Sequence, residues 1–314
     1  MMKNILISLL LMATIMSYAD PYLPQNGEYY TLDSDGYVIA FGKDPAFDNR
    51  GSTVGTAAVV RSDTRIKAWA TSVASVSFGA NMTTDSYDYS DVDYTDVSKA
   101  LGTATGDHYY GIVALGSGGS IVLHFDSGIS NGDGLDFAVF ENVDFAGFVE
   151  LAYVEVSSDG EHFVRFPNFY LGTSRLGAFE NANYPQLSYN LGSKYYKQFG
   201  QGYDLAELEY AYDFIMSGKS EFTDEFIESF LLNYQYLDLN NVSYVRIEDI
   251  PGDGSRLDSE GFPIYDPYKT EGPAGFDLQG VAVLNTAVVP EPAEGATVFG
   301  ASALLLAILR RRKK

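Results

Sequence analysis

The chain has 314 residues, no cysteine, three histidines and a formal net charge of −22, from 42 acidic and 20 basic side chains. The lack of cysteine excludes disulfides, thiol nucleophiles and cysteine-based zinc sites, and three scattered histidines argue against a histidine-based zinc site. The acidity argues against a nucleic-acid partner, because phosphate binding needs a cationic surface. Divalent cations and neutral sugars remain compatible with it, and the charge also favours solubility.

The N-terminus has the organisation of an export signal. Lys3 supplies a positive charge, residues 5–16 form an apolar run, and Ser17-Tyr18-Ala19 provides a small-x-small cleavage site. This order is typical of a secretory signal peptide rather than of a structural helix. We therefore expect residues 1–19 to be removed and the mature chain to begin near Asp20.

The region between about residues 20 and 289 is long enough for one large core and is predicted to be mainly β. Runs rich in β-branched and aromatic residues predict strands at 36–41, 74–78, 119–125, 137–140, 151–157, 162–166, 242–248 and 280–284. The Ser158-Asp159-Gly160 break between two such runs predicts a β-hairpin. Many short strands with Gly- and Asp-rich turns indicate an antiparallel β-sandwich.

One stretch departs from the strand pattern. Apolar residues at positions 222, 226, 227, 230 and 231 follow helical spacing, with Thr223 or Asp224 as the N-cap. Residues 205–216 form a second helix candidate. The sequence therefore predicts a partly helical insertion at about residues 170–240.

Two acidic clusters are candidate calcium sites. Calcium takes six to eight oxygen ligands, and loops rich in Asp, Asn and Gly can bring carboxylates and carbonyls together around it. The first cluster lies at 131–142 and the second runs from 248 to 277, through Asp266. The alternative is that these residues form hydrogen-bonded turns in solvated loops. The predicted metal ligands are Asp133, Asp136, Glu141, Asp249, Asp253, Asp258 and Asp277.

Catalytic interpretations have less support than binding. Two carboxylates can form a glycosidase site, but a chain with this many acids contains numerous pairs. The adjacent pairs Asp107-His108 and Glu161-His162 lack a recognisable nucleophile. Aromatic side chains can stack on sugars, or they can fill the core. The candidates for stacking are Trp69, Tyr87, Tyr89 and Tyr94.

The C-terminus carries the most specific pattern of the sequence. Pro290-Glu291-Pro292 precedes an apolar run at 296–309, which is followed by Arg310, Arg311, Arg312 and two lysines. Positive charge stays on the cytoplasmic side during export, and the run is shorter than the ~20 residues of a usual span. This tail resembles a PEP-CTERM sorting signal at residues 290–314. The alternative is an ordinary C-terminal anchor.

The PEP-CTERM resemblance implies a processing partner and a destination. In that family, an exosortase-type membrane enzyme cuts near the tripeptide and passes the protein to the cell envelope or to an extracellular polysaccharide matrix. The apolar span would contact the membrane before this processing.

Parts of the body resemble discoidin-like, galactose-binding-like domains. The resemblance lies in residues 115–125, in the hairpin at 154–163, and in the runs 242–247 and 279–284. It implies a jelly-roll-like sandwich that acts as a binding module, since many members bind sugars and several hold a structural calcium.

Together these features predict an exported bacterial cell-surface or extracellular-matrix protein with a calcium-stabilised sandwich that binds glycan or matrix polysaccharide. A secreted hydrolase acting on polysaccharide and a purely structural matrix protein are the alternatives. A catalytic role is the less favoured one.

Overall fold

The computed structural model describes most of the region between the two predicted signals. It describes the short strands β1 (Tyr30–Leu32) and β2 (Val38–Phe41), and then residues 57–82, 92–107, 109–142, 149–178, 180, 188–192, 194–195, 199–218 and 220–287. The predicted signal peptide and the predicted sorting signal lie outside the described residues.

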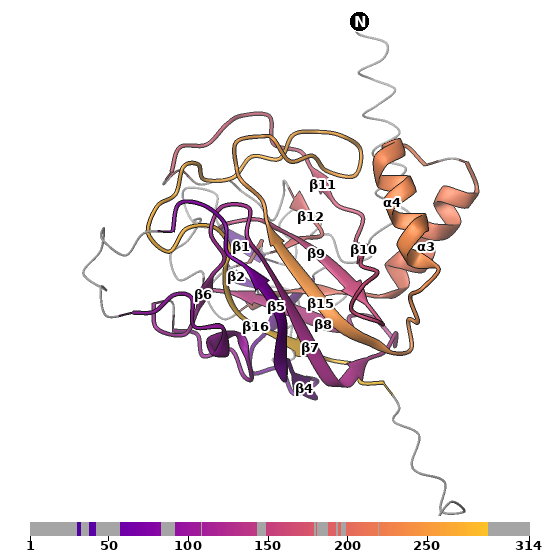
Figure 1. Cartoon of the computed structure of the whole chain (residues 1–314), viewed down its shortest axis with the longest axis horizontal. Coiled ribbons are helices and arrows are strands. Elements are labelled where there is room, and N and C mark those ends of the chain that lie inside the picture. Colours follow the sequence, from indigo (N-terminus) through magenta and orange to yellow (C-terminus); the bar gives the residue numbers. More distant parts are fainter. Residues whose placement is uncertain are drawn as a thin grey trace, which may run out of the picture.

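Two antiparallel six-stranded sheets form the body of the protein (Figure 1). The first sheet has the order β10-β9-β15-β7-β5, with β13 beside β9. Its strands are β10 (Val164–Arg165), β9 (Ala152–Ser157), β15 (Val242–Asp249), β7 (Ser120–Ile129), β5 (Ser72–Ser77) and β13 (Leu191–Gly192).

The second sheet has the order β3-β14-β8-β16-β4, with β6 beside β16. Its strands are β3 (Ala58–Val60), β14 (Phe199–Tyr203), β8 (Phe137–Glu141), β16 (Asp277–Val283), β4 (Ala68–Trp69) and β6 (Val113–Ala114). Two further strands, β11 (Phe169–Tyr170) and β12 (Ser188–Tyr189), pair with each other, and η1 (Val97–Ala100) is a short 3-10 helix.

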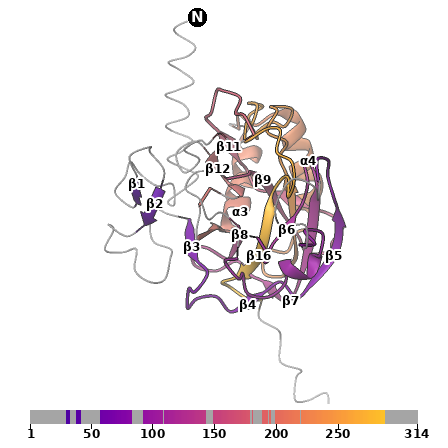
Figure 2. The same ribbon diagram turned by 90° about the vertical axis from the view of Figure 1, so that its left-hand side faces the viewer.

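The chain passes repeatedly from one sheet to the other. β7, β9 and β15 belong to the first sheet, whereas β8, β14 and β16 belong to the second, and every pairing within the sheets is antiparallel. In the view turned by 90°, β8 and β16 of the second sheet lie to the left of β5 of the first sheet (Figure 2). The predicted β-sandwich is confirmed.

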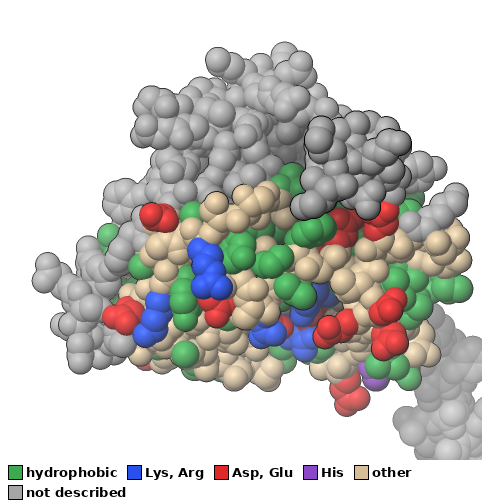
Figure 3. Space-filling model, turned by 90° about the horizontal axis from the view of Figure 1, so that it is seen from above, with side chains coloured by type: hydrophobic (Ala, Val, Ile, Leu, Met, Phe, Trp, Pro, Cys, Tyr) green, Lys and Arg blue, Asp and Glu red, His purple; other side chains and the backbone are tan. Residues whose placement is uncertain are grey.

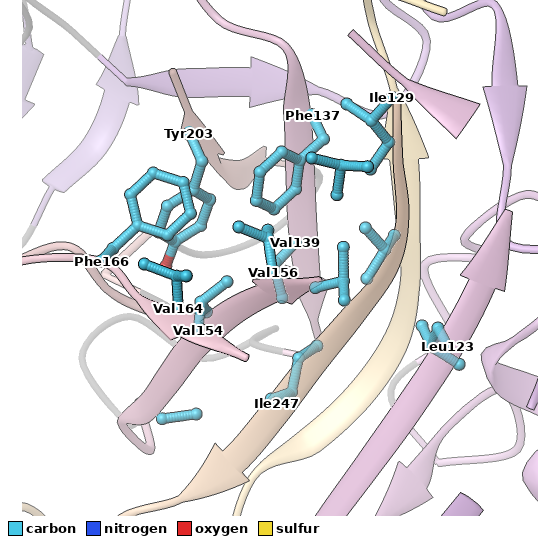
Figure 4. Packing of buried hydrophobic residues seen from close by; sticks show 14 of the residues in the cluster. Leu123, Ile129, Phe137, Val139, Val154, Val156, Val164, Phe166, Tyr203 and Ile247 are labelled. Atoms are coloured by element: carbon cyan, nitrogen blue, oxygen red, sulfur yellow. The ribbon is translucent and has the colours of Figure 1, made fainter. Parts of the chain in front are cut away.

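The core lies between the sheets. Phe137 and Val139 from β8 face Val154 and Val156 from β9 and Ile247 from β15 (Figure 4). In β15 the buried residues Val245 and Ile247 alternate with half-buried charged residues, as expected for a strand with one solvated face. β8 and β16 are buried throughout, because side chains such as Trp69 and Ile112 cover the outer face of their sheet.

Two helices occupy part of the predicted insertion, α3 (Ala206–Met216) and α4 (Asp224–Tyr234). Thr223 caps α4, since its side chain accepts a hydrogen bond from the Phe226 N–H. α4 lies beside β10 and α3 contacts α4 (Figure 1). Phe222, just before α4, contacts Phe169 of β11 with ring centroids 6.1 Å apart. β14, from the same segment of sequence, is a strand of the second sheet. In the described part of the chain, neither helix has the length and hydropathy of a membrane span.

The predicted hairpin joins β9 and β10. Gly160 has a φ of +79°, which favours glycine, and Asp159 accepts hydrogen bonds from the N–H groups of Glu161 and His162. His162 pairs with Asp159 at 2.7 Å and stacks on Tyr236. The Glu161-His162 pair is therefore part of the turn.

Candidate functional site

Five acidic side chains are buried at one end of the sandwich, and we call them the carboxylate cluster. The cluster consists of Glu141, Glu150, Asp249, Asp266 and Asp277, which are each 2–6% exposed. Acidic residues are almost never buried to this extent unless they are paired or bind a metal. The cluster is thus the strongest candidate for a functional site within the described residues.

Antiparallel pairing explains why these residues meet. Glu141 ends β8 and Asp277 begins β16, and the two strands pair with Leu278 opposite Glu141. Asp249 ends β15, where it lies opposite Ala152 at the start of β9. Glu150 immediately precedes that strand, and Asp266 lies in the loop between β15 and β16. The cluster therefore combines strand ends from both sheets.

Backbone N–H groups hold three of the carboxylates in place. Asp249 accepts hydrogen bonds through both oxygens, from Phe276 N and Gly118 N, each at 2.7 Å. Asp266 Oδ2 accepts a hydrogen bond from Leu151 N, and Glu141 Oε1 accepts one from Glu150 N. Hydrogen bonds of this kind favour the charged carboxylate.

The remaining two acids bind side chains. Glu150 Oε1 accepts a hydrogen bond from the Thr270 hydroxyl at 3.0 Å, and Asp277 Oδ2 accepts one from Asn142 Nδ2 at 2.9 Å. Two oxygens are buried without a hydrogen-bond partner, Glu141 Oε2 and Asp277 Oδ1. A buried carboxylate oxygen without a hydrogen-bond partner destabilises the folded state, so a ligand that binds these two atoms would stabilise it.

Burial and mutual repulsion both oppose ionisation of the cluster. Burial raises the pKa of Asp249 to about 7 and the pKa of Glu141 well above its ordinary value. Burial likewise raises the pKa values of Glu150, Asp266 and Asp277. Among neighbouring charges, Asp277 has the largest effect on both glutamates. A divalent cation would remove this repulsion.

Basic side chains in the first sheet and in the loop after β15 are engaged with other acids. Arg165 and Arg246 both pair with Glu155, and Arg256 pairs with Glu248 at 2.7 Å. The surface in Figure 3 likewise shows Lys and Arg side chains interspersed with Asp and Glu. Arg256 only partly offsets the effect of burial on the pKa of Asp249. The charge of the cluster is therefore poorly compensated by protein cations.

Glycines bring the backbone close to the cluster. Gly275 has a φ of +70°, and a Cβ atom at this position would lie 2.6 Å from the backbone of Gly116 and 2.9 Å from Asp249 Oδ1. A Cβ at Gly252 would lie 2.1 Å from Asp266 Oδ1. These positions need glycine because the main chain and the carboxylates share the same space.

The structure brings together three of the seven predicted metal ligands, Glu141, Asp249 and Asp277. Glu150 and Asp266 complete the cluster but were not among the predicted ligands. Asp266 belonged to the acidic stretch of the sequence. The only sequence signal for Glu150 is its position before a predicted strand.

The other four predicted ligands lie in different surroundings. Asp133 is exposed. Asp136 accepts hydrogen bonds from Gly132 N, Leu205 N and Asn285 Nδ2, and burial raises its pKa to about 7. Asp253 accepts a hydrogen bond from Ser255 N. Asp258 accepts hydrogen bonds from several backbone N–H groups, as in an ordinary turn.

The side chains of the carboxylate cluster are not arranged as a metal coordination shell. Within the ranges given above, no group of three or more His, Cys, Asp or Glu side chains is set out to hold a metal ion. A cation would therefore have to draw the unpartnered oxygens together. Calcium tolerates irregular and flexible coordination, which makes it the best-suited ion.

The predicted sugar-stacking residues lie mostly away from solvent or outside the described residues. Trp69 packs on Phe140 with ring centroids 5.4 Å apart, and Tyr94 is buried. Tyr87 and Tyr89 lie outside the described residues, as does His108. The exposed aromatic side chains of the described residues are instead Phe78, Tyr110, Tyr210, Tyr236, Phe262 and Tyr268.

No protein-family model matches the sequence, and no curated protein matches it.

Proposed function

We propose that the chain is an exported bacterial cell-surface or extracellular-matrix protein whose β-sandwich is stabilised by calcium and binds glycan or matrix polysaccharide. The observation that carries the calcium part is the burial of five carboxylates with two unpartnered oxygens at one end of the sandwich. Calcium coordinates oxygen and neutralises charge, which are the two things that this cluster requires.

The proposed location supports the choice of ion. The predicted signal peptide and the PEP-CTERM-like tail direct the chain out of the cytoplasm, with an exosortase-type enzyme as the processing partner. Extracellular calcium modules function with dissociation constants of roughly 0.1–1 mM. A modest site would therefore be filled in a calcium-containing medium.

Burial of the cluster favours a structural role for these acids over a catalytic one. Asp249 and Asp266 are each 2% exposed, so a polysaccharide chain cannot reach them in this arrangement. A glycosidase needs its two carboxylates on either side of an accessible sugar. Exposed aromatic side chains such as Tyr210, Phe262 and Tyr268, in contrast, can reach a glycan and stack on it.

Calorimetric titration of the mature chain with calcium, after treatment with chelator, tests the calcium part of the proposal. Binding with a dissociation constant of about 1 mM or tighter is expected. The absence of a binding signal would contradict it. A glycan array probed in calcium tests the binding part, and hydrolysis of labelled polysaccharides would favour the hydrolase alternative instead.

A further inference from the structure

Resting on the proposed calcium binding, we infer that one divalent cation binds between Glu141 Oε2 and Asp277 Oδ1, and that Asp249 positions the backbone around the ion instead of ligating it. The inference divides the carboxylate cluster into ligands and supporting groups. It rests on which carboxylate oxygens are already occupied.

Glu141 and Asp277 have the free capacity that a ligand needs. Each is more than nine-tenths buried, and each has one oxygen held by a hydrogen bond and one oxygen without a partner. The held oxygen fixes the carboxylate, and the free oxygen is available to the ion. Ligand carboxylates in metal sites are commonly fixed in this way by a second hydrogen bond.

Asp249 is placed differently. Its two oxygens accept hydrogen bonds from Phe276 N and Gly118 N, so direct ligation would compete with two short bonds. Phe276 directly precedes Asp277, and the bond from Asp249 therefore fixes the backbone that carries a ligand. We assign Asp249 as a positioning residue.

The two ligands come from paired strands of one sheet. Glu141 lies opposite Leu278, the neighbour of Asp277, so an ion between them would join the end of β8 to the start of β16. Asp249 then connects this pair to β15 in the other sheet. The backbone N–H of Glu150 donates to Glu141, and Asp266 accepts a hydrogen bond from the next residue, Leu151, so the acids Glu150 and Asp266 would add negative charge around the ion.

Amide substitutions separate the metal role from a purely structural one. Gln at position 141 and Asn at position 277 keep an oxygen for the existing hydrogen bond but replace the free oxygen by an N–H donor. That donor can bind the carboxylates that remain, and the neutral amide adds no buried charge. In chelator, E141Q and D277N should therefore be at least as stable as the wild type.

The test measures calcium affinity by titration calorimetry, and melting temperature with calcium and with chelator, for wild type, E141Q, D277N and the control D133N. Asp133 was predicted as a ligand from sequence but is exposed. The inference predicts at least about tenfold weaker calcium binding in E141Q and D277N, equivalent to about 1.4 kcal/mol. It also predicts loss of their calcium-dependent rise in melting temperature, with D133N behaving like the wild type.

Two results would overturn the inference. If E141Q and D277N both bound calcium as tightly as the wild type, other atoms would have to bind the ion. The wild-type protein would still melt at a higher temperature in calcium than in chelator, so the proposed calcium dependence would stand. Failure of these variants to fold in chelator, where the wild type folds, would make the two carboxylates structural acceptors. If the wild type itself neither bound calcium nor responded to it, the proposed calcium function would fail as well.

Discussion

The Oδ1 atom of Asp249 accepts a 2.7 Å hydrogen bond from the backbone N–H of Phe276. Asp249 ends β15 in the first sheet, and Phe276 directly precedes β16 in the second, so this bond connects the two sheets at the carboxylate cluster. A buried N–H group that loses its acceptor costs about 1–3 kcal/mol. This hydrogen bond is therefore expected to stabilise the folded protein whether or not an ion is bound.

The first prediction concerns Asp249→Ala. The substitution leaves the N–H groups of Phe276 and Gly118 without acceptors but also removes a buried carboxyl group. The free energy of unfolding should therefore fall by about 2 kcal/mol. Urea unfolding in chelator should show this loss. Asp253→Ala is the control, since Asp253 lies in a half-exposed turn. A wild-type unfolding free energy for Asp249→Ala would mean that the sheets do not depend on this bond.

The second prediction concerns Gly275→Ala, with Gly102→Ala as the matched control. Both glycines have a φ near +70°, but a Cβ at Gly102 meets no atom within 4 Å, whereas one at Gly275 lies 2.6 Å from the Gly116 backbone. Gly102→Ala should lower the free energy of unfolding by about 1–2 kcal/mol through backbone strain alone. Gly275→Ala should lower it by clearly more, because its Cβ also clashes with the backbone. Equal losses in urea unfolding would show that the close approach of the two backbones is unimportant.

The sequence was informative about the fold because each local pattern agreed with the packing. The alternation in 242–248 follows the single solvated face of β15, and the Asp159-Gly160 pair forms the predicted turn. Thr223 caps the predicted helix. The extent of the insertion was harder to predict, because β14 is only five residues long and its pairing with β3 and β8 is non-local.

The candidate site was less predictable because the cluster forms by long-range pairing. Asp133 and Asp136 are close in sequence to Glu141, yet they lie at the opposite end of β8 from the cluster. Glu150 and Asp266 lie far apart in sequence and meet only when β9, β15 and the loop before β16 pack together. Residue type indicated the chemistry, whereas the strand register determined which acids come together.

The third prediction concerns the pH dependence of stability at Asp136. Burial raises the pKa of Asp136 from 3.8 to about 7, so the folded state keeps a proton that the unfolded state loses near pH 4. The contribution of the Asp136 carboxyl to the free energy of unfolding is therefore fully present below pH 4. It is lost as the pH rises to about 7, and the loss is at most about 4 kcal/mol.

Asp136→Asn should weaken this decline, because the amide does not titrate. Unfolding free energies of wild type and variant between pH 4 and 7, in chelator, give the two slopes. The slopes are compared instead of the absolute values, since Asn also loses an acceptor for one of the three hydrogen bonds. Parallel slopes would contradict a raised pKa at Asp136.

The fourth prediction concerns processing at the two ends. Intact-mass analysis of protein from the envelope or matrix of the native host should give a chain that starts near Asp20 and lacks the residues beyond Pro292. Recovery of chains that end in Lys314 would indicate a permanent anchor. Neutral replacement of all five basic residues from Arg310 to Lys314 should reduce retention before cleavage, because these charges oppose translocation.

The central claim is that calcium stabilises the sandwich through the buried acids. The most direct measurement is the melting temperature of the mature wild-type chain in chelator and in millimolar calcium at one pH and ionic strength. At about ten times its dissociation constant, an ion that binds only the folded state adds about 1.4 kcal/mol, so calcium should raise the melting temperature by a few degrees. The same melting temperature in calcium and in chelator would contradict the account.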